Sequence, residues 1–300
     1  MSPRPWPALL AETHAHPGDV APPWSEHVQG IAHGSGYWFV TQADQVWRIP
    51  MTRELGAVGE HDRDVVRAGI PEPGVDHLGD CDVDGGVLYV AMEGTDPARI
   101  GAFDLDLRFR GSAPVAPQGT KCSWCAVNPV DGLLYSSDFH ADRLHTYRPS
   151  RSGGAVGLEH TGEVRLRSDD GSPLRLRRMQ GGAFSPHGHL YLTSDIRGGG
   201  LYGVEVRAGR CRMHVTIRHE PDWPEKDVIE GMTVVDLSDG VAPHMSGVVH
   251  VLVFDGHGPR PDYVWLRHFD VADESDRACF DRSGLNPSEL LDAAGPAASG

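Results

Sequence analysis

The sequence has fewer basic than acidic residues, few cysteines and no long hydrophobic run, and each of these shortages excludes a class of protein. Only two of its 27 basic residues are lysines, and the 42 acidic residues outnumber the basic ones. The net charge of −15 repels phosphate backbones and anionic lipid headgroups, so we expect neither a nucleic-acid partner nor a membrane partner. No stretch approaches the roughly 18 consecutive apolar residues of a membrane-spanning helix.

The cysteines and the first residues indicate a reducing compartment. The chain has five cysteines, which is an odd number, and their spacing does not match that of a disulfide framework. Both features argue against a disulfide scaffold. The first ten residues include three prolines and lack the apolar segment of a secretory signal. We therefore expect a cytoplasmic protein.

A weak internal repeat of about fifty residues organises the chain. Each of five segments begins with a short polar-to-apolar run, continues through a turn, usually rich in Gly or Asp, and ends in an apolar strand. The segments begin at His27, His77, Lys121, Arg178 and Val228. Their third residues are Gln29, Gly79, Ser123, Gln180 and Glu230, which lie 44 to 57 residues apart.

Further strands follow in each repeat and predict a β-propeller. Third strands are expected at 45–50, 99–104, 143–147, 201–206 and 262–269. Fourth strands are expected at 64–68, 107–115, 162–167 and 211–218. The fifth repeat lacks its fourth strand, and the leftover segment 7–14 is predicted to supply it and close the ring. The sequence therefore predicts an all-β fold, a single five-bladed propeller over residues 1–271. Residues 272–300 are predicted to form a tail with a short helix at 287–294. The alternative is a pair of β-sandwiches.

Two segments carry a resemblance to known propellers. Asn128–Asp138 reads NPVDGLLYSSD and Ser185–Asp195 reads SPHGHLYLTSD. Both resemble blades of the β-propeller superfamily, in the style of NHL and SMP-30-like repeats. The resemblance implies a fold and no particular function. Five-bladed glycosidases would imply central carboxylates from three successive blades, and Gln29 and Ser123 stand where acids would be needed.

The propeller topology predicts which residues meet at one end of the central channel. In a propeller, the inner strand of each blade begins at the face where the second strand ends. The first residues of the inner strands and the loops after the second strands therefore surround the same mouth of the channel. This mouth is the expected binding site. The residues expected to bind substrate are Gln29, Asp80, Trp124, Asp138, His140, Arg178 and Gln180. Alternatively, Asp138 caps a turn, and the two glutamines satisfy backbone groups of the channel.

Glu230 is the first candidate for a general base or a metal ligand, because Gln, Gly or Ser occupies its position in the other repeats. His27, His77 and Lys121 share another repeat position and are further catalytic candidates. Two histidines and one carboxylate suit a divalent metal, so His27, His77 and Glu230 are the predicted ligands. The cofactor is otherwise unknown, and Lys121 could alternatively close the rim in an ion pair.

These features favour an enzyme of hydrolase or lyase type that acts on a small polar metabolite. A non-catalytic binder of carbohydrate or another small ligand is one alternative, although a lectin would be expected to repeat the same residues in every blade. A protein-interaction scaffold is the other, although its rim should be apolar. The sequence leaves the reaction and the oligomeric state open.

Overall fold

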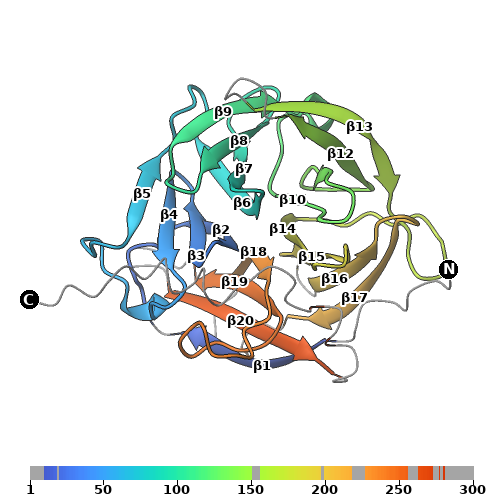
Figure 1. The fold of residues 1–300 in the computed structure, drawn as a ribbon. Helices are drawn as coiled ribbons and strands as arrows, with labels where there is room; N and C mark the ends of the chain where they lie inside the picture. The colour runs from blue at the N-terminus through green and yellow to red at the C-terminus, as the bar shows by residue number, and fades with distance from the viewer. Residues whose placement is uncertain are drawn as a thin grey trace, which may run out of the picture.

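The computed structural model describes residues 10–18, 20–150, 156–196, 199–217, 227–255, 263–272, 277 and 280. Within them, twenty strands form five four-stranded antiparallel sheets that surround a central axis (Figure 1). The predicted all-β, five-bladed propeller is therefore confirmed. The predicted helix at 287–294 and most of the predicted tail lie outside the described residues.

Each blade runs from an inner strand at the axis to an outer strand at the rim. The first blade consists of β2 (Val28–Gly34), β3 (Tyr37–Gln42), β4 (Gln45–Pro50) and β5 (Val66–Gly69). The second consists of β6 (His77–Asp84), β7 (Val87–Glu93), β8 (Arg99–Asp104) and β9 (Phe109–Pro114). The third consists of β10 (Cys125–Val127), β11 (Leu134–Ser136), β12 (Arg143–Ser150) and β13 (Gly157–Arg165).

The last two blades follow the same order. The fourth consists of β14 (Met179–Phe184), β15 (Leu190–Ser194), β16 (Gly200–Glu205) and β17 (Arg210–Thr216). The fifth consists of β18 (Asp227–Val234), β19 (Val249–Asp255), β20 (Tyr263–Val271) and β1 (Leu10–Pro17). Short 3-10 helices, η1 (Leu55–Ala57) and η2 (Ala116–Gln118), lie in loops. No helix in the described ranges is long and apolar enough to cross a membrane.

The N-terminal strand closes the ring as the outer strand of the fifth blade. Antiparallel pairing joins β1 to β20 from the Leu10–Val271 pair to the Pro17–Trp265 pair. Residues 10–14 of the predicted segment belong to this strand, while 7–9 lie outside the described residues. The pairing leaves no exposed edge on β20. The Arg267 guanidinium donates two hydrogen bonds of 2.6 Å to the carboxylate of Glu12 and so fixes this register.

The hydrophobic core is divided into five clusters, each between two neighbouring blades. Between the fifth and first blades, one cluster contains Trp38 and Trp47 together with Leu252 and Leu266. Each blade therefore contributes to two clusters, and its apolar side chains are covered only when both neighbours are in place. The four cysteines among the described residues are buried and form no disulfide with one another.

Candidate functional site: the channel mouth and the adjacent pockets

The centre of the propeller is filled by the carboxylate of Asp80. Its Oδ1 accepts a hydrogen bond from the backbone N–H of Ile31 at 3.0 Å. Its Oδ2 accepts from the backbone N–H groups of Gly182 at 3.1 Å and Met232 at 3.2 Å. Burial raises the pKa of Asp80 well above its usual value, and these N–H donors oppose the rise. One side chain thus joins the inner strands of four blades.

Three glycines provide the space for this carboxylate. A Cβ atom on Gly30 would lie 2.5 Å from the Cα of Asp80, and one on Gly231 would lie 2.6 Å from its Cγ. A Cβ atom on Gly181 would lie 2.9 Å from Oδ2. Real Cβ atoms do not approach other atoms so closely, so the close approach of the backbone requires glycine at these positions.

In four blades, the residue before the central position lies near the start of the inner strand, at the channel mouth, and Ser123 is the equivalent residue of the third blade. Together these residues form a ring, called here the mouth ring, which consists of Gln29, Gly79, Ser123, Gln180 and Glu230. Within it, Nε2 of Gln180 donates to Oε1 of Glu230 at 3.5 Å. Oε1 of Gln29 lies 3.0 Å from Nε2 of His77, and Nε2 of Gln29 donates to the carbonyl of His27. The hydroxyl of Ser123 is buried and makes no hydrogen bond within the described structure.

Glu230 is the acidic member of the mouth ring, and its side chain is almost completely buried. The residue is 4% exposed. Burial raises its pKa well above the usual value, and the nearby carboxylates of Asp195 and Asp80 raise it further. The guanidinium of Arg178 lowers it, without reversing the direction. The carboxyl group therefore retains its proton at a pH where an exposed glutamate is ionised.

Two carboxylates connect neighbouring blades at the rim of the mouth. Oε1 of Glu93 accepts from the backbone N–H of Cys122 at 3.0 Å, and its Oε2 lies 2.5 Å from Nζ of Lys121. In the same way, Oδ1 of Asp195 accepts from the backbone N–H of Ile229 at 3.1 Å, while Oδ2 pairs with Arg178. Lys121 therefore forms an ion pair at the rim, which was the alternative to a catalytic role for this residue.

A pocket of 510 Å³ lies beside this ion pair, between the second and third blades. It is lined by Asp76, His77, Glu93, Gly94, Thr95, Asp96, Thr120 and Lys121. Two predicted catalytic residues, His77 and Lys121, thus share one pocket. Burial lowers the pKa of His77, which favours the neutral imidazole.

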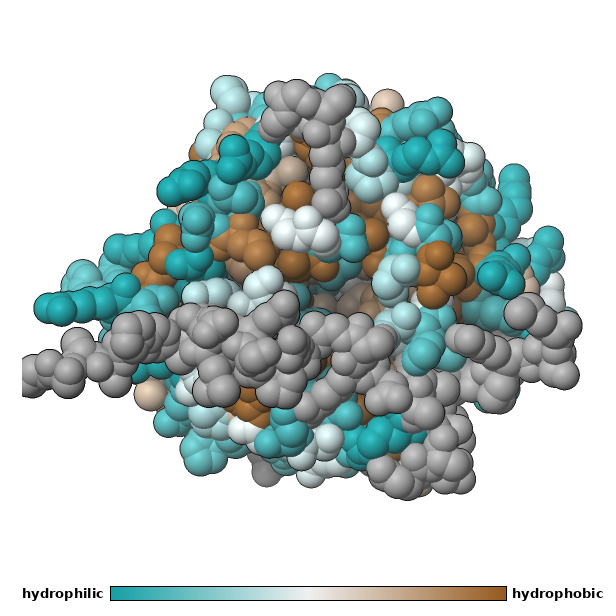
Figure 2. Space-filling view, in the orientation of Figure 1, coloured by the Kyte–Doolittle hydropathy of each residue, from teal (hydrophilic) through white to brown (hydrophobic). Residues whose placement is uncertain are grey.

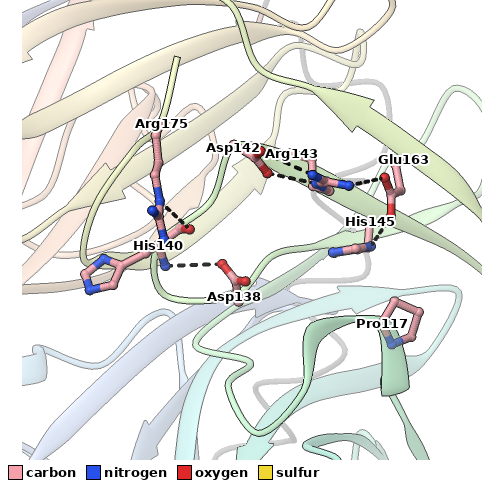
Figure 3. A pocket seen from close by; sticks show the side chains of 8 residues that line it. All are labelled: Pro117, Asp138, His140, Asp142, Arg143, His145, Glu163 and Arg175. Atoms are coloured by element: carbon pink, nitrogen blue, oxygen red, sulfur yellow. Dashed lines mark hydrogen bonds and ion pairs between the residues drawn. The ribbon is translucent and has the colours of Figure 1, made fainter. Parts of the chain in front are cut away.

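A second pocket, of 360 Å³, lies at the loop after β11 (Figure 3). It is lined by Pro117, Asp138, His140, Asp142, Arg143, His145, Glu163 and Arg175. Asp138 and His140 were predicted to bind substrate. Oδ1 of Asp138 also accepts from the backbone N–H of His140 at 3.2 Å, so the turn-capping interpretation describes a contact that is present.

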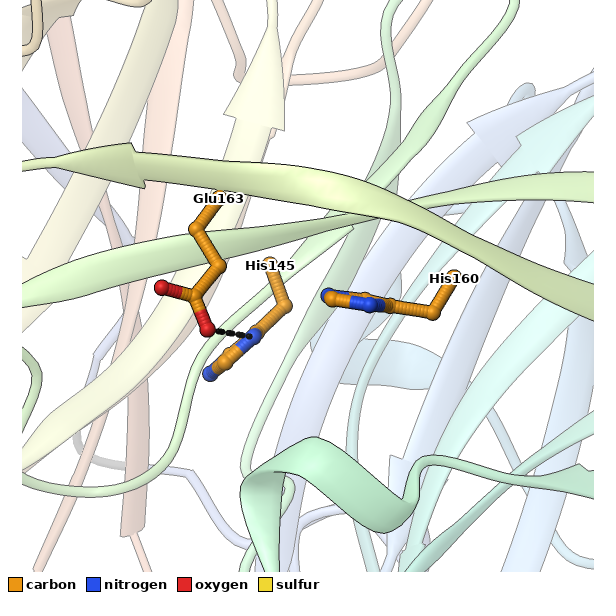
Figure 4. A group of neighbouring side chains, drawn as sticks. All are labelled: His145, His160 and Glu163. Atoms are coloured by element: carbon orange, nitrogen blue, oxygen red, sulfur yellow. Dashed lines mark ion pairs between the residues drawn. The ribbon is translucent and has the colours of Figure 1, made fainter.

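One group of side chains at this pocket has the geometry of metal ligands. The ligand atoms of His145, His160 and Glu163 all lie within 4.8 Å of one another (Figure 4). Burial lowers the pKa of His145, and the Arg143 guanidinium lowers the pKa of Glu163. A neutral imidazole and an ionised carboxylate are the forms that bind metals.

The sequence did not indicate this group, because it predicts that the outer strand of the third blade begins at residue 162. The strand begins at Gly157, so His160 and Glu163 belong to one element. The predicted ligands His27, His77 and Glu230 do not form such a group in the described structure. His27 lies on the rim with an exposed side chain.

Two residues predicted to bind substrate have no accessible surface. Asp80 and Trp124 are both 0% exposed. The carboxylate of Asp80 is bound by backbone N–H groups, and Nε1 of Trp124 donates to the hydroxyl of Ser137 at 2.9 Å. We therefore interpret both as structural residues beneath the mouth. Gln29, Arg178 and Gln180 remain partly exposed or exposed at the mouth itself.

Comparisons with known proteins support the fold. No protein-family model matches the chain, and a search of curated proteins finds no match. A glutaminyl cyclase from Myxococcus xanthus is 12% identical, with a TM-score of 0.54, over 90% of this chain and 100% of that chain. Regucalcin from Agrobacterium tumefaciens, a calcium-binding protein, is 13% identical, with a TM-score of 0.42, over 80% and 74%.

A third structure, the PQQ-bound aldose sugar dehydrogenase from Streptomyces coelicolor, is 12% identical, with a TM-score of 0.43, over 89% of this chain and 100% of that chain. The similar structures thus include enzymes and a calcium-binding protein. Only the likeness to the glutaminyl cyclase, with its TM-score of 0.54, supports an argument, and at 12% identity it shows the propeller fold alone.

Proposed function

We propose that the protein is an enzyme that binds a small polar metabolite at the channel mouth and uses Glu230 for proton transfer. The observation that carries this proposal is a carboxyl group, 4% exposed, in a ring whose other members are Gln, Gly and Ser. The ring position does not require an acid, since Gln180 and Gln29 occupy it in two other blades. A carboxyl group with a raised pKa can donate a proton to a substrate and take one back near neutral pH.

The cations at the rim of the mouth suit a small polar or anionic substrate, and one of them, Arg178, interacts electrostatically with Glu230. The side chain of Arg178 is 48% exposed and that of Lys121 is 58% exposed, so both cations can contact a ligand while they remain paired with carboxylates. The amide of Gln180 and the unpaired hydroxyl of Ser123 add uncharged hydrogen-bonding groups. These groups support hydrolase or lyase chemistry, in which a proton moves to or from an oxygen or carbon atom of the substrate.

Three further observations agree with an enzyme rather than a scaffold. Among the described residues, Val130 is the one large hydrophobic residue that is exposed. The described residues therefore form no apolar rim to which a protein partner could dock. In Figure 2, hydrophilic side chains lie along much of the periphery of the visible face, and hydrophobic ones are visible in patches between them. The fold is also shared with a glutaminyl cyclase, which is compatible with catalysis.

The test is a thermal-shift screen of small polar metabolites, followed by assays of product formation for each stabilising compound. Glu230→Gln preserves the size of the side chain and removes its titrating group. We expect turnover to fall by about 100-fold or more, the usual contribution of a general acid or base. We expect the melting temperature to fall little, because the substitution removes a buried ionisable group.

Glu159→Gln is the matched control, because Glu159 is an exposed glutamate that pairs with Arg148 on the outer surface of the third blade. Its turnover should equal that of the parent protein. Equal turnover in Glu230→Gln and in the parent protein would remove Glu230 from the mechanism. Bound metabolites without any turnover in the parent protein would favour the non-catalytic binder.

A further inference from the structure

The two outer strands of the third blade contain a local irregularity that gathers metal-binding side chains. Gly162 pairs with Thr146, whereas His160 pairs with the next residue of β12, so Thr161 is an extra residue in β13. Residues three apart in a regular strand point to opposite faces, but a bulge between them can bring both to one face. The hydroxyls of Thr146 and Thr161 lie 2.9 Å apart and hold the bulge in place. His160 and Glu163 consequently share a face.

The third member of the group comes from the neighbouring strand. His145 is directly opposite Glu163 in the strand pairing, and its ring lies 5.6 Å from the ring of His160. Nδ1 of His145 lies 3.7 Å from Oε1 of Glu163, which is too long for a hydrogen bond. His145 is 4% exposed, and this buried nitrogen has no hydrogen-bond partner within the described structure. A buried polar atom without a partner is unfavourable unless something else binds it.

We propose that His145, His160 and Glu163 bind one divalent transition-metal ion, with Zn²⁺ as the best match. Two imidazoles and one carboxylate are the nitrogen and oxygen ligands such ions prefer. Zinc–nitrogen bonds of about 2.1 Å place the ligands of a tetrahedral ion about 3.4 Å apart. The pair formed by His145 and Glu163 is close to this spacing at 3.7 Å. The other spacings are at most 4.8 Å, and the side chain of His160 is exposed and can adjust its position.

The surroundings favour a metal with an accessible coordination position. Oε2 of Glu163 accepts from Arg143 at 2.8 Å, which orients the carboxylate and leaves Oε1 directed toward His145 (Figure 4). Three protein ligands leave a fourth position of a tetrahedral ion open. His145 and Glu163 both line the 360 Å³ pocket, so water or a small anion can reach that position from the pocket. This site is separate from the mouth ring and does not depend on the function proposed for Glu230.

The test uses the metal-free protein with its 300-residue chain intact. Titration calorimetry with Zn²⁺ should show one saturable site above the background of other surface histidines. Co²⁺, added in place of Zn²⁺, should give a visible absorption band that saturates at the same stoichiometry. We expect His160→Ala and Glu163→Gln each to weaken Zn²⁺ binding by at least about tenfold, the loss that even outer-shell partners cause. His160 is exposed, so its replacement should leave folding intact.

Two controls match these variants. Glu159→Gln removes an exposed carboxylate from the same strand, and His61→Ala removes an exposed histidine from the first blade. Both should bind Zn²⁺ as the parent protein does, and so should Glu230→Gln. The proposal is overturned if no saturable site is found. It is also overturned if His160→Ala and Glu163→Gln bind Zn²⁺ and Co²⁺ as tightly as the controls.

Discussion

Nδ1 of His250 lies 2.7 Å from Nδ1 of His268 in the interior of the fifth blade. The second nitrogen of His250 lies 2.8 Å from the carbonyl oxygen of Val235. Because a carbonyl can only accept, that nitrogen carries the proton, and Nδ1 of a neutral His250 is left as an acceptor. Burial favours the neutral form of both rings, so His268 donates through Nδ1. The ring of His268 also stacks on that of His14 in β1, at 4.4 Å between centroids.

This arrangement predicts a loss of stability in acid. Burial lowers the pKa of His250 to about 4 and that of His268 to about 2, whereas both titrate near 6.5 in the unfolded chain. The unfolded chain therefore takes up protons first as the pH falls. The stability that these residues contribute is complete above pH 6.5 and declines below it. Between pH 7 and pH 5, the loss should be about 2 kcal/mol for each histidine.

The measurement must separate the histidines from the buried acids. Burial raises the pKa of Asp82 to about 7, and it also raises the pKa values of Asp80 and Glu230. Protonation of these three acids therefore stabilises the folded protein as the pH falls. The informative quantity is the difference between the parent protein and a His250→Leu/His268→Leu variant in urea unfolding at pH 7 and pH 5. The variant should lose less stability in acid. Equal losses would contradict the assignment of neutral rings.

A second prediction concerns the close approach at the propeller centre. Gly231→Ala places a Cβ atom 2.6 Å from Cγ of Asp80, where neither backbone nor carboxylate can move without breaking hydrogen bonds to several blades. We expect the free energy of unfolding to fall by about 3 kcal/mol or more, because overpacking and lost buried hydrogen bonds add. Urea unfolding measures the change.

Gly69→Ala is the control for this substitution. A Cβ atom on Gly69 meets nothing within 4 Å, and the residue is not among the glycines with positive φ. Its stability should change by less than about 1 kcal/mol. Similar losses at Gly69 and Gly231 would show that the contact with Asp80 does not matter.

The sequence predicted the blades well because their signals are local. The third strands at 45–50 and 99–104 match β4 and β8 in both bounds, since turns and apolar runs delimit them. The orientation of inner side chains was harder to predict. The pairing of β6 with β7 shifts register between Leu78 and Cys81, so alternation no longer tells which way Asp80 points. The same limitation concealed the group around the bulge at Thr161, whose geometry depends on pairing with β12.

A last prediction tests the closure of the ring by β1. Removing residues 1–17 leaves β20 with an unpaired edge, and it removes Leu10 from the apolar cluster that contains Phe269. It also removes Glu12, whose carboxylate pairs with Arg267. Since the core clusters link the blades in a ring, the loss should extend beyond the fifth blade and lower the free energy of unfolding by at least about 4 kcal/mol, a large part of a typical total of about 5–15 kcal/mol. Removing residues 1–8 retains every pair between β1 and β20 and serves as the control. Melting curves compare the two truncations with the full chain. If the chain lacking residues 1–17 melts at the temperature of the control, the ring does not depend on β1 for its stability.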